Sequence, residues 1–288
     1  MVKIALPKGS LQDATFALFK KAGWSFSVSS RSYTPMGDDP ELEAILLRAQ
    51  EIPRYVEMGV IDVGITGFDN VCECEADVHE VCELIYSKAT SKPYKWVLAA
   101  PKNSEIKCAK DLEGKRVATE LLNVTRNYFK SKGVSVNVEF SWGATEVKVP
   151  DLVDAVVEGT ETGSTLKAHG LEILDEILVS TTRFICNKKS WEDPKKREKI
   201  ENIAMMLDAA LTADTLVGLK MNVPKASLQE VISIIPALQN PTINNLSNEN
   251  WVAVEIIVEQ KIVRDIIPCL KRAGASGIVE YPLSKVIY

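Results

Sequence analysis

The chain has 288 residues, of which 46% are hydrophobic and 25% are charged, and its formal net charge at pH 7 is -5. This composition is that of an ordinary globular protein, long enough for two or three domains. The negative charge argues against nonspecific nucleic-acid binding, which needs an excess of Lys and Arg on one face. No secretory signal or membrane-length apolar run is visible, and the six scattered Cys fit reduced thiols. The sequence therefore predicts a cytoplasmic protein without membrane or nucleic-acid partners.

Strands and helices are predicted to alternate up to about residue 211. The predicted strands span 2–6, 24–29, 43–47, 60–66, 96–100, 116–119, 134–140, 152–157, 171–179 and 182–186. The predicted helices span 11–22, 52–58, 123–131, 166–169 and 194–211, and a further helix starts near residue 69. Such alternation favours a mostly parallel sheet with helices on its faces.

The tail from about residue 212 has a different order of elements. The sequence predicts strands at 215–223, 241–246, 251–258 and 277–281, with helices at 225–235 and 260–273. The order βαββαβ is that of a small ferredoxin-like sandwich.

The segment 152–174, LVDAVVEGTETGSTLKAHGLEIL, carries the clearest functional pattern. A short apolar strand ends at Glu158 and Gly159, hydroxyl side chains surround Gly163, and a helix follows. A turn through Gly into a helix leaves backbone N–H groups at the positive end of the helix dipole, which is what a phosphate monoester needs. Glu158 could accept hydrogen bonds from a sugar diol beside that phosphate. The alternative is an ordinary βα turn with a Thr N-cap.

Two other predicted strands end in residues that could contact a ligand. Lys8 follows the first strand and could attract phosphate oxygens, and Thr66–Gly67 ends another strand in the same way. Arg48, just after the strand 43–47, is a further phosphate candidate. The alternatives are a turn Lys and a solvated Arg. Asn123 and Thr125 could simply cap the helix that starts there.

A run rich in Cys and acidic residues could indicate zinc. Cys72, Cys74, His79 and Cys82 have the spacing C-x-C-x4-H-x2-C, which matches no standard zinc finger. We interpret them as small core thiols on a helix.

The ordered segments together resemble the ATP phosphoribosyltransferases of histidine biosynthesis, in their long, feedback-regulated form, over nearly the whole chain. The segments that carry the resemblance are 6–11, 51–56, 64–67, 115–119, 123–129 and, most specifically, 154–158 with 162–171.

The resemblance implies an α/β fold of two lobes of the periplasmic-binding-protein type II class, with the active cleft between them, and a C-terminal ferredoxin-like βαββαβ regulatory domain. Residues 1–92 and 183–211 would form the first lobe, 93–182 the second, and 212–288 the regulatory domain. It also implies a Mg²⁺-dependent reaction in which ATP and 5-phosphoribosyl diphosphate give N1-(5-phosphoribosyl)-ATP and diphosphate.

Residue roles follow from the resemblance by position. Lys8 and Arg48 would be catalytic, because cations stabilise the diphosphate leaving group. The implied substrate-binding residues are Asp154, Glu158, Thr160, Glu161, Thr162, Gly163, Ser164, Thr165, Thr66, Gly67, Asp69 and Glu146. No general base for the adenine nitrogen and no metal ligand is assigned. Histidine would inhibit by binding between neighbouring tail domains of a homo-oligomer, dimer to hexamer, with Thr242 as a candidate contact.

The chain departs from the family pattern in three places, and two other classes of function stay open. The family often has Arg where this chain has Ser10, the segment 85–95 replaces a Gly- and Cys-containing pattern, and Gly159 stands where the ordinary phosphoribosyltransferase loop has a second acid. The alternatives are a binding module that uses the same two-lobed fold without chemistry, and an allosteric protein with an inactive site.

Overall fold

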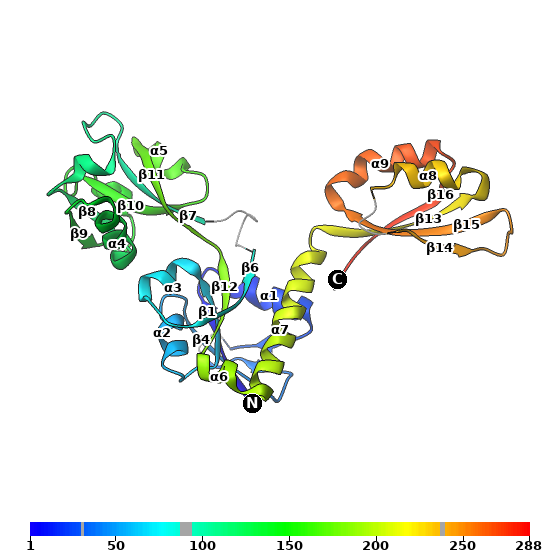
Figure 1. Cartoon of the computed structure of the whole chain (residues 1–288), viewed down its shortest axis with the longest axis horizontal. Coiled ribbons are helices and arrows are strands. Elements are labelled where there is room, and N and C mark those ends of the chain that lie inside the picture. The colour runs from blue at the N-terminus through cyan, green and yellow to red at the C-terminus, as the bar shows by residue number, and fades with distance from the viewer. Residues whose placement is uncertain (30–31, 87–93, 237–239) are drawn as a thin grey trace. The chain divides into compact units, whose positions relative to one another are not determined.

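The computed structural model describes residues 1–29, 32–86, 94–236 and 240–288 (Figure 1). The chain divides into two compact units. The larger unit contains Met1–Lys20 and Trp24–Ala204, and the smaller unit contains Lys21–Gly23 and Met205–Tyr288. Within the described ranges, no helix is both long enough and apolar enough to cross a bilayer.

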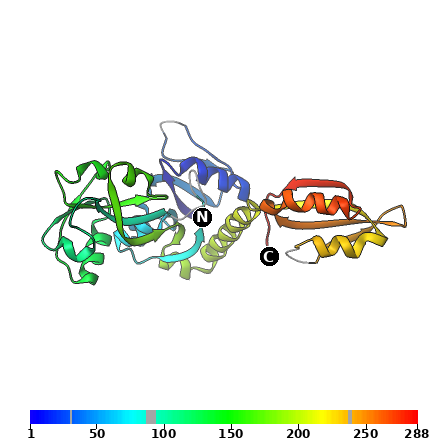
Figure 2. The same ribbon diagram turned by 90° about the horizontal axis from the view of Figure 1, so that it is seen from above.

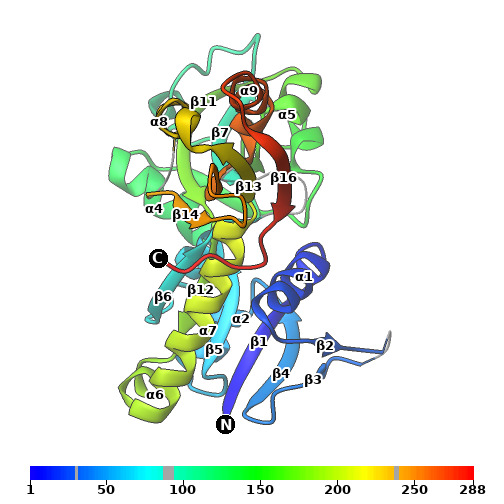
Figure 3. The same cartoon turned by 90° about the vertical axis from the view of Figure 1, so that its right-hand side faces the viewer.

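The first sheet of the larger unit has five strands. Their order is β4 (Leu42–Arg48), β1 (Val2–Lys8), β5 (Val63–Gly67), β12 (Thr182–Cys186) and β6 (His79–Leu84). β4, β1 and β5 run parallel, whereas β12 is antiparallel to both of its neighbours. Figure 3 shows β1, β4 and β5 side by side, with α1 (Gln12–Ala22) next to them. The carboxyl ends of these parallel strands therefore meet at one edge, where open α/β sheets bind ligands.

The short helix α2 (Ile52–Glu57) packs directly on this sheet. Ile52 and Val56 lie four residues apart, so they share one side of the helix, and both are fully buried with Ala5 of the sheet. A Cβ on Gly64 would lie 2.3 Å from Cγ2 of Ile52. Only Gly fits at this position because the helix approaches the strand so closely.

The second sheet of the larger unit also has five strands. Their order is β11 (Leu171–Ser180), β7 (Tyr94–Pro101), β10 (Ala155–Thr160), β8 (Arg116–Thr119) and β9 (Asn137–Phe140). β10, β8 and β9 run parallel, whereas β7 is antiparallel to both of its neighbours. Val157 on one face shares a core with Phe129 of α4 (Leu122–Lys132), and Val156 on the other face shares a core with Leu166 of α5 (Ser164–Ala168).

Four of the five strands in each sheet point the same way, as expected for mostly parallel sheets: β4, β1, β5 and β6 in the first, and β11, β10, β8 and β9 in the second. The exceptions, β7 and β12, are the first strands that the chain forms after it leaves the other sheet. Their direction is reversed because the chain returns across the edge at which the parallel strands end. The remaining elements of this part are α3 (Phe68–Cys74), β2 (Phe26–Ser27), β3 (Met36–Gly37), η1 (Ala109–Leu112), η2 (Thr145–Lys148), α6 (Lys188–Glu192) and α7 (Pro194–Ala213).

The smaller unit is an antiparallel sheet with two helices on one face (Figures 1 and 2). The strand order is β14 (Thr242–Asn245), β15 (Trp251–Glu259), β13 (Leu216–Pro224) and β16 (Ser276–Pro282). The helical elements are η3 (Lys225–Ser227), α8 (Leu228–Ile234) and α9 (Gln260–Arg272). One apolar core joins the sheet and both helices. The predicted fold class, a two-lobed α/β body with a ferredoxin-like βαββαβ tail, is confirmed.

Candidate active site

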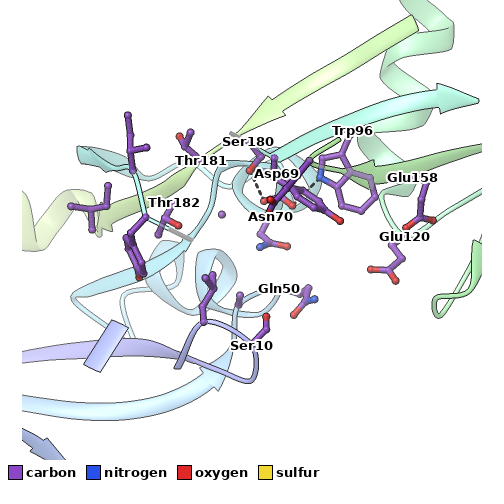
Figure 4. Close-up of a pocket in the computed structure, with 18 residues that line it drawn as sticks. Ser10, Gln50, Asp69, Asn70, Trp96, Glu120, Glu158, Ser180, Thr181 and Thr182 are labelled. Atoms are coloured by element: carbon purple, nitrogen blue, oxygen red, sulfur yellow. Dashed lines mark hydrogen bonds between the residues drawn. The ribbon is translucent and has the colours of Figure 1, made fainter. Parts of the chain in front are cut away.

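A cavity of about 440 Å³ lies in the larger unit, and residues of both sheets line it (Figure 4). Ser10, Gln50 and Asn70 come from the first sheet and its following loops and helices. The second sheet and its following loop contribute Trp96, Glu120 and Glu158, and the crossover contributes Ser180, Thr181 and Thr182. This size suits a small ligand.

The cavity is acidic. Asp69, Glu120, Glu158 and Glu161 line it, and the described lining includes no Lys, Arg or His. Burial, with the nearby Asp69 carboxylate, raises the pKa of Glu120. Burial also raises the pKa of Glu158, and the carboxylates of Glu146 and Glu120 add to the effect. These carboxyl groups therefore repel one another unless a cation or a proton joins them.

Glu158 presents an unpaired oxygen. Its Oε2 is buried and has no hydrogen-bond partner among the described residues. A buried acceptor without a partner is costly, and such groups are expected to find one in a ligand or in water. The neighbouring Thr145 hydroxyl lowers the pKa of the same carboxyl group, against the larger effect of burial. Glu158 is therefore the residue of this cavity most suited to receive a ligand hydroxyl.

Asp69 connects the two sheets. Its carboxylate accepts the indole N–H of Trp96 at 3.0 Å and the hydroxyl of Ser180 at 2.8 Å, and its own backbone N–H donates to that hydroxyl oxygen at 3.0 Å (Figure 4). A Cβ on Gly67 would lie 2.1 Å from Oδ1 of Asp69, so Gly67 makes room for this arrangement. Asp69 lines the cavity as predicted, but both of its carboxylate oxygens already accept bonds from the protein.

The bend after β10 is exposed. Gly163 has a φ of 74°, in the left-handed region that favours Gly, and its N–H donates to Oγ1 of Thr160 at 2.7 Å. The hydroxyl of Thr162 donates to Ser164 at 3.0 Å. Thr162, Ser164 and Thr165 are exposed, and α5 begins at Ser164. The strand predicted over 152–157 is displaced by three residues, since β10 begins at Ala155 and continues through Glu158 to Thr160.

Lys8 and Arg48 are neighbours at the carboxyl ends of β1 and β4, where they face each other in the strand register. The ammonium nitrogen of Lys8 lies 3.7 Å from the centre of the Tyr33 ring, and Arg48 is exposed. Neither side chain lines the cavity. Ser10 and Gln50, each two residues further along, do line it. Lys8 and Arg48 are therefore close in the sequence to two residues that line the cavity. Both lie at the carboxyl edge of the first sheet.

Other predicted residues have structural partners. Thr66 is fully buried, and its hydroxyl donates to the carbonyl of Ala49 at 2.7 Å. Asp154 directly precedes β10, whereas Glu158 lies toward the other end of that strand, and the Asp154 carboxylate accepts the backbone N–H of Arg116 at 2.8 Å. The structure therefore does not bring Asp154 to the cavity. The roles of these residues in substrate binding stay predictions.

The four candidate zinc ligands occupy two different elements. Cys72 and Cys74 lie on α3, which ends at Cys74, whereas His79 and Cys82 lie on β6. The helix predicted for all four is therefore wrong for the second pair. Within the described part of the chain, no group of three or more His, Cys, Asp or Glu residues is arranged to hold a metal ion.

Thr242 belongs to the smaller unit. It is exposed on β14 and lines a cavity of about 260 Å³ there, together with Glu255 and Tyr281. The Tyr281 hydroxyl bonds the Glu255 carboxylate. Its role as a histidine contact stays a prediction.

The sequence analysis missed several residues of the cavity. Glu120 directly follows the carboxyl end of β8, so the rule that selected Lys8 could have selected it too. Tyr94, Trp96 and Ser180 carry no such signal, because only the pairing of β7 and β11 with their neighbours brings them to the cavity.

Comparisons with known proteins match the chain along its length to one family. A family model described as ATP phosphoribosyltransferase matches residues 48–209, and a model described as the HisG C-terminal domain matches residues 213–285. Over 287 residues the chain is 61% identical to the ATP phosphoribosyltransferase of Chlorobium phaeobacteroides and 59% identical to that of Chlorobium chlorochromatii. Each alignment covers 100% of this chain and 98% of the relative. A chain of the ATP phosphoribosyl transferase (HisG:HisZ) complex from Thermotoga maritima is 31% identical, with a TM-score of 0.63 over 72% of this chain and 99% of that chain.

Proposed function

The chain belongs to the ATP phosphoribosyltransferase family of histidine biosynthesis, and from this premise we propose that it transfers the phosphoribosyl group of 5-phosphoribosyl diphosphate to N1 of ATP, with release of diphosphate. One structural observation, in addition to family membership, supports this reaction. Oε2 of Glu158, buried and without a partner among the described residues, lies in the acidic cavity, on the strand that leads into an exposed, hydroxyl-rich bend. This is the arrangement that a ribose with a 5-phosphate requires.

Glu158 would accept hydrogen bonds from the ribose hydroxyls. The bend Thr160, Glu161, Thr162, Gly163, Ser164 and Thr165 would hold the 5-phosphate through its hydroxyl and N–H donors. Displacement of diphosphate builds positive charge on the ribose ring, which the nearby carboxylates stabilise, and negative charge on the leaving group. The remaining catalytic contribution is the positioning of two substrates in one cavity.

Lys8 and Arg48 would stabilise the leaving diphosphate. They lie side by side at the carboxyl edge of the first sheet, and two adjacent cations repel each other unless an anion joins them. Thr66 and Gly67 at the end of β5, with Asp69 on α3, would shape the same side, and Glu146 would lie near Glu158. Asp154, outside the cavity lining, would act only through the pairing of its segment with Arg116. We propose 1–92 with 183–211, 93–182 and 212–288 as the functional divisions of the chain.

The acidic lining fits a divalent cation. Mg²⁺ is usually held by one or two carboxylates together with substrate phosphates, so it does not need a preformed cage of protein ligands. Glu120, whose carboxyl pKa is raised by burial and by Asp69, would contribute such a ligand. Bound Mg²⁺ would neutralise charge on the diphosphate. We propose that the metal enters with the phosphorylated substrates.

The smaller unit would provide regulation. We propose that histidine binds to it, with Thr242 as a contact, in a cytoplasmic homo-oligomer. The cavity that Thr242 lines offers the Glu255 carboxylate, which would pair with the amino group of an amino acid. Inhibition requires that histidine binds more tightly to the inhibited state than to the active one.

The proposal is tested by mixing the purified chain with ATP, 5-phosphoribosyl diphosphate and Mg²⁺. Formation of phosphoribosyl-ATP, followed by its absorbance, is the expected result, and added histidine should slow it. Binding of both substrates without any product would favour a binding module or an inactive allosteric protein. Thr242→Val should weaken the effect of histidine and leave the uninhibited rate unchanged, and unaltered inhibition would remove Thr242 from the histidine site.

A further inference from the structure

The ring of Tyr94 occupies the space beside Gly159. A Cβ on Gly159 would lie 2.2 Å from Cε1 and 2.4 Å from the hydroxyl oxygen of Tyr94. Gly159 lies opposite Trp96 in the strand register, and the rings of Tyr94 and Trp96 meet edge to face with centroids 6.0 Å apart. Tyr94 is also opposite Ser180 on its other side. The absence of a side chain at Gly159 therefore allows Tyr94 to lie over the strand that carries Glu158.

The hydroxyl of Tyr94 is a hydrogen-bond donor at neutral pH. Tyr94 lines the acidic cavity. Burial, followed by the carboxylates of Glu158, Asp69, Glu120 and Glu161, raises the pKa of Tyr94 to about 12. Among the residues that the structure describes, none bonds this hydroxyl.

Three other donors of the cavity, Trp96, Ser180 and Tyr86, already have protein partners. The indole N–H of Trp96 and the hydroxyl of Ser180 donate to Asp69, and the hydroxyl of Tyr86 lies 2.7 Å from that of Thr15. A phosphorylated ligand brings oxygens that need donors, and carboxylates cannot supply them. Tyr94 is placed to supply one, because its ring packs against Gly159 and no described residue accepts a bond from its hydroxyl.

We propose that Tyr94 is a substrate-binding residue, whose hydroxyl donates a hydrogen bond to an oxygen of 5-phosphoribosyl diphosphate over the Glu158–Gly159 end of β10. This inference rests on the proposed function, because it assigns a ligand oxygen to the same cavity. The neutral phenol of Tyr94 would provide a hydrogen-bond donor in a cavity that is otherwise lined by several carboxylates. The packing against Gly159 fixes where that donor points.

Tyr94→Phe removes the hydroxyl and keeps the ring. We expect 5-phosphoribosyl diphosphate, titrated calorimetrically with Mg²⁺, to bind about tenfold more weakly, since hydrogen bonds to charged groups contribute that much or more. The KM for this substrate should rise, and the KM for ATP should change much less. Tyr55→Phe, on α2 and outside the cavity lining, is the matched control and should bind as the unaltered chain does.

Unchanged binding of 5-phosphoribosyl diphosphate by Tyr94→Phe, or a loss confined to ATP, would overturn the proposal. This result is separable from failure of the proposed function. If the unaltered chain makes no phosphoribosyl-ATP, the transferase activity is refuted, while the calorimetric comparison still decides whether Tyr94 contacts the ligand.

A double-substitution cycle tests the packing. Gly159→Ala should weaken binding of 5-phosphoribosyl diphosphate, because the new methyl group displaces the Tyr94 ring. The same substitution in a Tyr94→Ala background should cost much less, because the ring is gone. An equal loss in both backgrounds would show that Gly159 is needed for another reason. Thermal unfolding of each variant, with a retained cooperative transition, verifies that the chain is folded.

Discussion

The carboxylate of Glu73, on α3, caps the start of α4, a helix that packs on the second sheet. Its main partner there is Asn123. It accepts the backbone N–H of Asn123 at 2.9 and 3.1 Å and that of Val124 at 3.1 Å, and the Asn123 side-chain amide donates back to the Glu73 carbonyl at 2.9 Å. The N-cap residue of α4 is Leu121, a buried apolar residue without a capping oxygen. Glu73 on α3 therefore provides the bonds that an N-cap side chain normally makes.

Removal of this cap should destabilise the larger unit. Glu73→Ala leaves the first-turn N–H groups of α4 without a protein acceptor, so we expect a loss of about 1 kcal/mol in the free energy of unfolding. Amide hydrogen exchange at Asn123 and Val124 should become faster. Glu75→Ala is the control, because Glu75 is exposed and, among the described residues, its side chain bonds only that of Asn127. Equal losses for the two variants would argue against a capping role.

Asp69→Asn should affect both stability and turnover. The amide group turns one acceptor into a donor, which then faces the Trp96 N–H or the Ser180 hydroxyl. We expect a loss of about 1–3 kcal/mol in urea unfolding and a lower kcat/KM, because the two sheets lose a shared anchor at the cavity. Asp151→Asn, at an exposed position, is the control and should change neither value. Activity that survives without any loss of stability would contradict the anchoring role.

Glu158→Gln should weaken ligand binding while it stabilises the chain near neutral pH. Burial raises the pKa of Glu158, so the folded state binds a proton more tightly than the unfolded state does. The protonated carboxyl group favours folding at low pH, and this contribution is lost as the pH rises through the folded-state value. The neutral amide avoids that loss.

Thermal unfolding over a range of pH measures this effect. The melting temperature of Glu158→Gln should exceed that of the unaltered chain at pH 7, and the difference should vanish below the ordinary pKa of Glu. Binding of 5-phosphoribosyl diphosphate should become about tenfold weaker. Glu139→Gln, exposed on β9, serves as the control. A pH-independent difference in melting temperature would rule out titration of Glu158 as its cause.

Gly64→Ala should destabilise the first sheet. The added methyl group would overlap Cγ2 of Ile52, and overpacking of this kind costs about 1–3 kcal/mol. In an Ile52→Ala background the same change should cost less, because the overlapping atom is absent. Urea unfolding of the four chains gives the coupling energy. Additive losses would indicate that Gly64 is constrained by something other than α2.

The order of elements was predictable because each signal is local. The alternation of strands and helices, the Gly residues that end helices and the βαββαβ order of the tail all follow from patterns a few residues long. Strand ends were less predictable, and β10 extends three residues beyond Val157 because pairing with β7 continues to Thr160. The Cys-rich run was assigned to one helix, but Glu75 adopts a left-handed conformation that ends α3.

The sequence by itself determined the family, the fold class and the strand-end position of Lys8 and Arg48. Only the tertiary structure decided which side chains already have partners. Asp69 bonds Trp96 and Ser180, which are 27 and 111 residues away in the chain. No periodicity or motif encodes such a bond, because it depends on how the two sheets meet in the folded chain. For the same reason the space that Gly159 leaves for Tyr94 appears only once β7 pairs with β10.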